Sequence, residues 1–278
     1  MLPVRTVTYD SQKALWLAAV CYQTYRQYTD PNGDYARPAG FRTVADLAAR
    51  SLGGDEEPFG FVLESPDEAV VAFRGTSSAS DWLSDALAVQ TDYPYVYESG
   101  QTHLGFTGIY RSARDQVQSA LDRIRPGKRL YVTGHSLGAA LAVLCSLDAA
   151  VHSSFDSPIL YTFGSPRVGD PDFVRSFAGG AGSFFRVSNL YDAVTYLPPT
   201  TFKLPRLDQA YEYRHIPGLV TLEFNNGSMS SNHVIGSYFA ALSKLDPAYA
   251  RRLRESEPDF CPPLIGENGS NNRQLTLP

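Results

Sequence analysis

Residues 129–151, which read RLYVTGHSLGAALAVLCSLDAAV, decide the fold. Residues 129–133 are rich in β-forming side chains, with the apolar run Leu130-Tyr-Val132 at their centre, which predicts a strand. The residues from Leu137 onward are apolar on nearly every side, which predicts a buried helix. Between them Gly134-His-Ser-Leu-Gly138 matches G-x-S-x-G, a pattern in which a sharp turn holds a serine up between a strand and a helix. The small residues at both ends of the pattern let strand and helix approach closely.

Strands and helices alternate on both sides of this stretch. Such alternation predicts a three-layer α/β fold with a mainly parallel central sheet. An amphipathic first helix is expected from Ser11 to about Arg26, and a polar, peripheral tail is expected over 262–278. The other expected strands are 59–64, 69–73, 158–163 and 184–187, and the other expected helices are 108–124, 171–177, 234–244 and one that begins at Pro247.

Two further segments have a weaker pattern. Residues 44–52 are expected to form a second short helix after a loop rich in Gly, Pro and Asp. Residues 211–215 and 219–224 are expected to pair as a hairpin.

Length and composition limit the protein class. The 278 residues include 43% hydrophobic and 19% charged residues, which is an ordinary balance for a folded protein. We expect a single domain over 1–278, because a chain of this length can bury a core without disulfides or metal. The net charge of −5 argues against a nucleic-acid partner. No apolar run approaches the roughly 20 residues of a membrane-spanning helix.

The three cysteines, Cys21, Cys145 and Cys261, have no metal-type spacing. Cys145 is expected to be a buried thiol, whereas Cys21 and Cys261 would be able to pair in an exported protein. The short apolar run 14–20 lacks a small-x-small cleavage site after it, so it is interpreted as part of the first helix and not as a signal peptide. A cytoplasmic location is therefore expected, or secretion if the chain is a mature form.

Ser136 needs a base, because a serine hydroxyl is a weak nucleophile on its own. Three histidines follow it in the chain. His152 lies some four turns along the same helix, and His215 falls within an expected strand. His233 follows a polar loop just before a helix, where an imidazole is able to reach over the sheet. We therefore expect His233 to be the base and keep His215 as the second candidate.

The base must itself be oriented by an acid. In hydrolases whose serine follows a strand–helix turn, the acid comes next in the chain and the histidine last. Asp192 fits this order, because it follows the expected strand 184–187. Its rivals Asp156, Asp170 and Asp172 all precede that strand.

An oxyanion hole requires backbone N–H groups aimed at the developing charge. The amide of Leu137, directly after the serine, is one candidate donor. The loop after the strand 69–73 offers Thr76 as the second, because Gly75 before it permits close approach. An ordinary turn that contains glycine remains the alternative interpretation of this loop.

Five motifs follow one another along the chain: 73–77 with 81–85, 103–106, 132–141, 162–169 and 192–199. Together they resemble the motifs of the class 3 lipases, the fungal-type triacylglycerol lipases with an α/β-hydrolase fold. The resemblance covers roughly residues 60–245 and implies Ser136 as nucleophile, Asp192 as acid, His233 as base, and Thr76 and Leu137 as oxyanion donors. His103 and His135 are interpreted as structural. Two positions depart from the family pattern: Ala139 replaces a frequent glycine, and the aromatic residue after His233 comes late, at Tyr238.

The resemblance also implies a short helical lid over about 77–92. Within it Trp82, Leu83 and Leu87 recur at helical spacing and would present an apolar face to a lipid surface. The alternative is a fixed surface helix whose apolar side belongs to the core.

These features together predict a serine hydrolase that cleaves carboxylic esters of acylglycerols through an acyl-enzyme, and the resemblance favours triacylglycerol lipase. Phospholipase A1 or galactolipase and a feruloyl-type esterase remain alternatives within the enzyme class, and a non-catalytic lipase-like scaffold is the alternative outside it. The expected partner is a lipid or ester substrate at a lipid–water interface. No cofactor or metal is expected.

Overall fold

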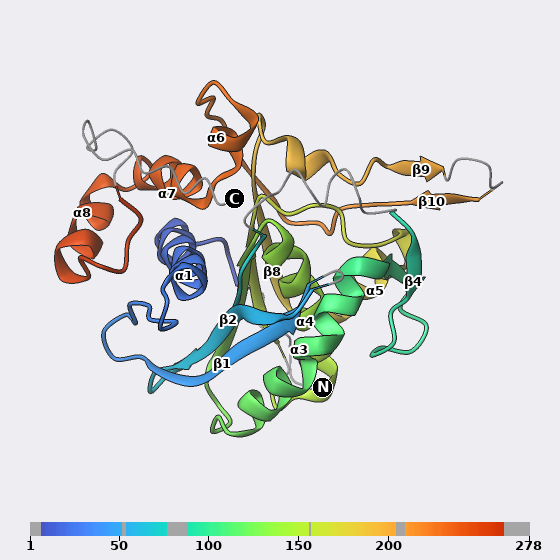
Figure 1. The fold of residues 1–278 in the computed structure, drawn as a ribbon, viewed down its shortest axis with the longest axis horizontal. Coiled ribbons are helices and arrows are strands. Elements are labelled where there is room, and N and C mark those ends of the chain that lie inside the picture. Colours follow the sequence, from blue (N-terminus) through green and yellow to red (C-terminus); the bar gives the residue numbers. More distant parts are fainter. Residues whose placement is uncertain (1–6, 52–53, 77–87, 156, 204–208, 264–278) are drawn as a thin grey trace.

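The computed structural model describes residues 7–51, 54–76, 88–155, 157–203 and 209–263 (Figure 1). Within them a seven-stranded sheet has the order β1-β2-β3-β6-β7-β8-β11. The first three strands pair antiparallel and the remaining pairs are parallel, which confirms the mainly parallel sheet. The strands are β1 (Arg42–Arg50), β2 (Glu56–Glu64), β3 (Glu68–Phe73), β6 (Arg129–His135), β7 (Ile159–Phe163), β8 (Ser183–Asn189) and β11 (Leu219–Leu222).

Helices cover both faces of this sheet, as Figure 1 shows. The side chains of β3 alternate between the two faces: Val71 and Phe73 pack on the side of α3 and α4, whereas Val70 and Ala72 pack on the side of α1. The three-layer α/β architecture is therefore confirmed. One face carries α3 (Leu104–Asp122), α4 (Leu137–His152) and α5 (Pro171–Gly180), and the other carries α1 (Ser11–Thr29), α7 (Ile235–Ser243) and α8 (Pro247–Ser256).

Smaller elements decorate the edge of the sheet where the parallel strands end. Two antiparallel pairs lie there, β4 (Gln90–Asp92) with β5 (Gln101–His103), and β9 (Thr201–Lys203) with β10 (Ala210–Glu212). The chain also forms the 3-10 helix η1 (Ala193–Tyr196) and the short helix α6 (Met229–His233).

Helix α1 begins at the N-cap Asp10, whose carboxylate accepts hydrogen bonds from the amides of Gln12 and Lys13. Its residues Ala14 to Cys21 are all buried, so the helix is enclosed on every side and not only along one stripe. The cause is its position between the sheet and the helices α7 and α8.

Two expectations were wrong. The helix expected over 44–52 is a strand instead: residues 44–50 belong to β1, which pairs antiparallel with β2 across irregular register steps, and Leu52 lies outside the described residues. Sheet pairing at this edge overrides the helical preference of the alanines and leucine. Residues 211–215 and 219–224 do not form a hairpin, because β10 pairs with β9 and β11 adds in parallel to β8.

All three cysteines are buried free thiols, so Cys21 and Cys261 are not paired. The sulfur of Cys21 lies 3.3 Å from the hydroxyl of Thr133, and burial raises the pKa of Cys21 to about 12.

No helix in the described part of the chain is long and apolar enough to span a membrane. A single domain over 1–278 stays a prediction.

Helices α3 and α4 are joined by a buried carboxylate. The side chain of Asp148 is fully buried in α4 and forms an ion pair with Arg114 of α3, at 2.7 Å. Its two oxygens accept further hydrogen bonds, which compensate for the loss of water around the charge. The donors are Tyr110, Arg114, Gln118 and His152.

We expect Asp148→Asn to lower the free energy of unfolding by on the order of 3 kcal/mol, because the substitution leaves the Arg114 guanidinium without its buried counter-charge. Urea denaturation followed by circular dichroism measures the change. The matched control is Asp115→Asn, which removes a second carboxylate beside Arg114 that is 98% exposed and is expected to cost less than about 0.5 kcal/mol. Equal effects of the two substitutions would contradict the assignment.

Candidate active site

Ser136 occupies the turn between β6 and α4 with a positive φ of 59°. A β-carbon at Gly134 would lie 2.1 Å from the carbonyl oxygen of Gly138, and one at Gly138 would lie 2.3 Å from the carbonyl oxygen of Phe73. Only glycine fits at either position, so the G-x-S-x-G pattern follows from the close approach of β3, β6 and α4. The Ser136 hydroxyl makes no capping bond to α4 and is directed to another partner.

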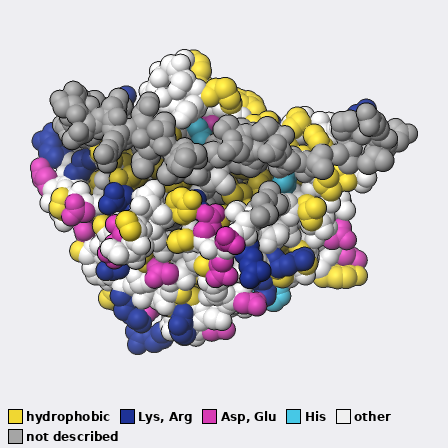
Figure 2. Space-filling view, in the orientation of Figure 1, with side chains coloured by type: hydrophobic (Ala, Val, Ile, Leu, Met, Phe, Trp, Pro, Cys, Tyr) yellow, Lys and Arg dark blue, Asp and Glu magenta, His cyan; other side chains and the backbone are white. Residues whose placement is uncertain are grey.

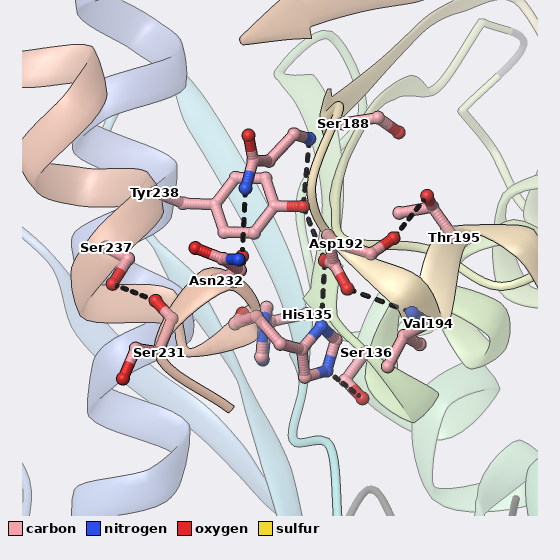
Figure 3. A network of polar contacts seen from close by, with 12 residues as sticks. His135, Ser136, Ser188, Asp192, Val194, Thr195, Ser231, Asn232, Ser237 and Tyr238 are labelled. Atoms are coloured by element: carbon pink, nitrogen blue, oxygen red, sulfur yellow. Dashed lines mark hydrogen bonds and ion pairs between the residues drawn. The ribbon is translucent and has the colours of Figure 1, made fainter. Parts of the chain in front are cut away.

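That partner is His233, the last residue of α6. The hydroxyl oxygen of Ser136 lies 2.8 Å from Nε2 of His233, and Nδ1 of His233 lies 2.8 Å from Oδ2 of Asp192. All three residues are buried, and Figure 3 shows the polar network around them. The structure thus brings together the three residues that the sequence analysis singled out. They come from the loops after β6, β8 and β11, which end at the same edge of the sheet.

Three groups hold the Asp192 carboxylate in place. Besides His233, it accepts hydrogen bonds from the amide of Val194 at 3.0 Å and from the hydroxyl of Tyr238 at 2.6 Å. Burial and the charge of Asp192 keep the pKa of Tyr238 well above its usual value, so its phenol remains a proton donor. The amide of Asn189 in turn donates to the Tyr238 oxygen at 3.1 Å. The late aromatic position after His233 was the one sequence sign of this contact.

Gly164, at the end of β7, is a second feature that the sequence analysis missed. Its φ is +56°, and a β-carbon there would lie 2.8 Å from Oδ2 of Asp192 and 3.2 Å from the ring of His233. A side chain at this position would therefore push into the pair that Asp192 and His233 form.

The rival histidines have other partners. Nε2 of His215 lies 2.7 Å from the carbonyl oxygen of Thr195, and burial, reinforced by Arg186, lowers the pKa of His215 to about 3. His152 pairs with Asp148, as described above. His103 caps α3 by accepting from backbone amides.

The other candidate acids that lie in the described residues also have other partners. Asp170 caps α5 by accepting a hydrogen bond from the amide of Phe173 at 2.7 Å. Asp172 forms an exposed ion pair with Arg175. Asp156 lies outside the described residues.

The expected oxyanion donors belong to two segments that border Ser136. Leu137 is the first residue of α4, so its amide has no acceptor within the helix. The loop after β3 lies against the turn, because a β-carbon at Gly75 would come within 2.9 Å of the Ser136 β-carbon. Thr76 follows directly and is half-buried. Trp82, Leu83 and Leu87 of the expected lid lie outside the described residues, as do all of 77–87.

Among the described residues, no three or more His, Cys, Asp or Glu side chains lie together so as to hold a metal ion. At the site itself, a hydroxyl, an imidazole and a carboxylate contact one another in sequence.

Three comparisons relate this geometry to known proteins. The chain is 35% identical over 154 residues to a lipase of Rhizomucor miehei, covering 53% of this chain and 42% of that protein. It is 31% identical over 200 residues to phospholipase A1-II 3 of Oryza sativa subsp. japonica, covering 57% and 48%. A solved structure described as a triacylglycerol lipase with a serine-protease triad at its catalytic centre superposes with a TM-score of 0.60 at 25% identity, covering 70% of this chain and 77% of that one.

The chain spans less than half the length of these two curated relatives. The model of the family described as Lipase (class 3) matches residues 70–202, which hold Ser136, Asp192 and the expected oxyanion donors. The match makes this part of the chain similar to the class 3 lipase family. The mainly parallel sheet, the helices on both of its faces and the serine turn after β6 form an α/β-hydrolase fold, as in the superposed lipase structure.

Proposed function

We propose that the protein is a serine hydrolase that cleaves carboxylic esters of acylglycerols, with Ser136 as nucleophile, His233 as base and Asp192 as acid. The observation that carries the proposal is the pair of 2.8 Å contacts that joins Ser136 to His233 and His233 to Asp192. The names of the relatives, a lipase and a phospholipase A1, support ester hydrolysis on lipids.

In the first half of the reaction, the Ser136 oxygen attacks the ester carbonyl carbon while Nε2 of His233 takes the hydroxyl proton. The amides of Leu137 and Thr76 donate to the negative oxygen that forms. As the intermediate collapses, His233 returns the proton to the leaving alcohol and an acyl-Ser136 ester remains. Asp192 keeps Nδ1 of His233 protonated and stabilises the imidazolium throughout.

In the second half, His233 takes a proton from water, and the resulting hydroxide attacks the acyl carbon. The same amides stabilise the second tetrahedral intermediate. His233 then returns the proton to the Ser136 oxygen, which leaves the fatty acid and restores the enzyme.

Exposed apolar side chains around the site support a lipid–water interface as the place of reaction. We define the apolar rim as Tyr191, Tyr196, Met229 and Val234, which are 47%, 55%, 65% and 44% exposed. They flank Asp192 and His233 in the chain, and Figure 2 shows hydrophobic side chains gathered along the upper edge of the molecule near α6. Apolar groups clustered beside a catalytic site are typical of contact with a lipid surface.

Phospholipase A1 is the second candidate, and the similarity to the rice enzyme favours it. Both candidates use the same residues and the same acyl-enzyme. They differ only in the group that leaves with the glycerol backbone, so substrate rates decide between them.

Ser136→Ala is expected to lower kcat on p-nitrophenyl esters by at least about 10⁴-fold, because the acyl-enzyme is no longer able to form. The measurement is p-nitrophenol release from C4 to C16 esters, then fatty-acid release from triolein and from phosphatidylcholine. Ser119→Ala, at an exposed position of α3, is the matched control. Faster hydrolysis of triolein supports the triacylglycerol lipase, and faster hydrolysis of phosphatidylcholine supports the phospholipase. Hydrolysis that survives Ser136→Ala would overturn the proposal.

Gly164→Ala is expected to lower kcat by about 10²-fold, because the new methyl group displaces Asp192 and His233 from line. Gly179→Ala is the control, since a β-carbon at that position of α5 meets nothing within 4 Å. Kinetics on a p-nitrophenyl ester, with circular dichroism to verify folding, measure both. A Gly164→Ala enzyme as active as the control would show that activity does not depend on the absence of a side chain at position 164.

Met229→Asp is expected to weaken adsorption to a triolein emulsion about 10-fold, because a buried methionine contributes roughly 1.5 kcal/mol when it leaves water. Sedimentation of the emulsion and assay of the protein left in solution give the partition coefficient. Val151→Asp is the control, because Val151 is 51% exposed at the other end of α4 from Ser136. If both substitutions weaken adsorption equally, the apolar rim is not the contact surface.

A further inference from the structure

His135 stands next to Ser136 and has no step in the proposed reaction, yet it contacts His233. Its Nε2 lies 2.7 Å from the carbonyl oxygen of His233, and the two imidazole rings have centroids 4.6 Å apart. Its Nδ1 lies 2.7 Å from the hydroxyl of Tyr25, which belongs to α1. A chain of hydrogen bonds therefore runs from helix α1 through the serine turn to the backbone of the catalytic histidine.

The protonation of His135 follows from its partners. A carbonyl oxygen only accepts, so Nε2 of His135 carries the proton and donates to His233. Burial and the neighbouring His233 keep the pKa of His135 well below its usual value, so the ring is neutral and Nδ1 accepts from the Tyr25 hydroxyl. A neutral ring in this place also spares His233 a repulsion when it becomes an imidazolium.

Tyr25 also lies against the loop after β3, which contains Gly75. A β-carbon at Gly75 would lie 2.3 Å from the Tyr25 hydroxyl oxygen and 2.7 Å from the carbonyl oxygen of His135. Burial raises the pKa of Tyr25, with Arg74 and a hydrogen bond from the backbone of Gly75 opposing the rise. The hydroxyl of Tyr25 thus lies where the loop before Thr76, the turn at Ser136 and the link to His233 meet.

We propose that Tyr25 and His135 are positioning residues for the hydrolytic reaction: the Tyr25 hydroxyl orients the His135 ring, and His135 holds the backbone of His233 so that its Nε2 stays in line with Ser136. The inference rests on the proposed function, because it concerns the rate of Ser136 acylation. It adds helix α1, which lies outside the matched family segment 70–202, to the parts that determine that rate.

The effect is expected on kcat and not on KM, because neither side chain is assigned a contact with substrate. A displacement of the base by about 1 Å is enough to cost on the order of 10²-fold in rate. A contact that only stabilised the fold would lower the melting temperature and the fraction of active molecules, and would leave the rate constant of each active molecule unchanged.

The test compares Tyr25→Phe with Tyr22→Phe, the same change one turn earlier on α1, where the structure gives the hydroxyl no hydrogen bond to any described residue. Titration with diethyl p-nitrophenyl phosphate gives the fraction of reactive Ser136 and its rate constant. Steady-state hydrolysis of p-nitrophenyl butyrate by the same preparations gives kcat per titrated site and KM.

We expect Tyr25→Phe to lower both the rate constant of Ser136 phosphorylation and kcat per titrated site by about 10-fold. KM should stay within about twofold, and Tyr22→Phe should match the parent protein. His135→Leu should cost about 10²-fold, because it removes the donor to His233. His135→Gln should recover at least part of this loss, since its amide N–H is able to replace Nε2–H.

Two results would overturn the proposal that Tyr25 and His135 position His233. In one, Tyr25→Phe and Tyr22→Phe have the same rate constant per titrated site. In the other, His135→Gln is as slow as His135→Leu although both are folded. Ser136→Ala separates this failure from a failure of the proposed function. Hydrolysis that survives Ser136→Ala refutes the proposed function itself. An inactive Ser136→Ala together with a Tyr25→Phe enzyme of normal rate refutes only the positioning role of Tyr25 and His135.

Discussion

The positive φ of Ser136 is the constraint on which the rest of the site depends. Residues other than glycine rarely adopt this backbone conformation. Ser136 keeps it here because β3, β6 and α4 pack closely around the turn. Gly134 and Gly138 make that packing possible, and the buried helix α4 anchors it to the core. The apolar contacts of the central layer thus offset the conformational strain of the turn. The turn in return leaves the Ser136 hydroxyl directed at His233.

Parallel strands then bring the partners to the same place. The loops after β6, β8 and β11 supply Ser136, Asp192 and His233, although these residues are far apart in the chain. Strand β7 lies between β6 and β8, so its own end at Gly164 falls beneath the contact of Asp192 with His233. The order of the strands therefore explains both where the three residues come from and why the first residue after β7 is a glycine.

The sequence predicted the parts of this arrangement that follow from local pattern and chain order. The strand–turn–helix at 129–151, the alternation around it and the order of Ser136, Asp192 and His233 are of this kind. Residues 44–52 were assigned wrongly because edge pairing with β2 outweighs local preference. The contacts of Tyr25 and Tyr238 were missed because they depend on how α1 and α7 pack over the sheet, and no spacing in the chain encodes that packing.

Those two tyrosines show that the site extends beyond the segment in which its motifs lie. Tyr25 and Tyr238 come from helices on the same face of the sheet, which contact each other through a shared core. One hydroxyl ends at the Asp192 carboxylate and the other, through His135, at the His233 backbone. Packing of α1 against α7 therefore connects to both Asp192 and His233. A change in that core that moves one helix is expected to alter the alignment of Asp192 and His233 with Ser136 even though it touches none of the three.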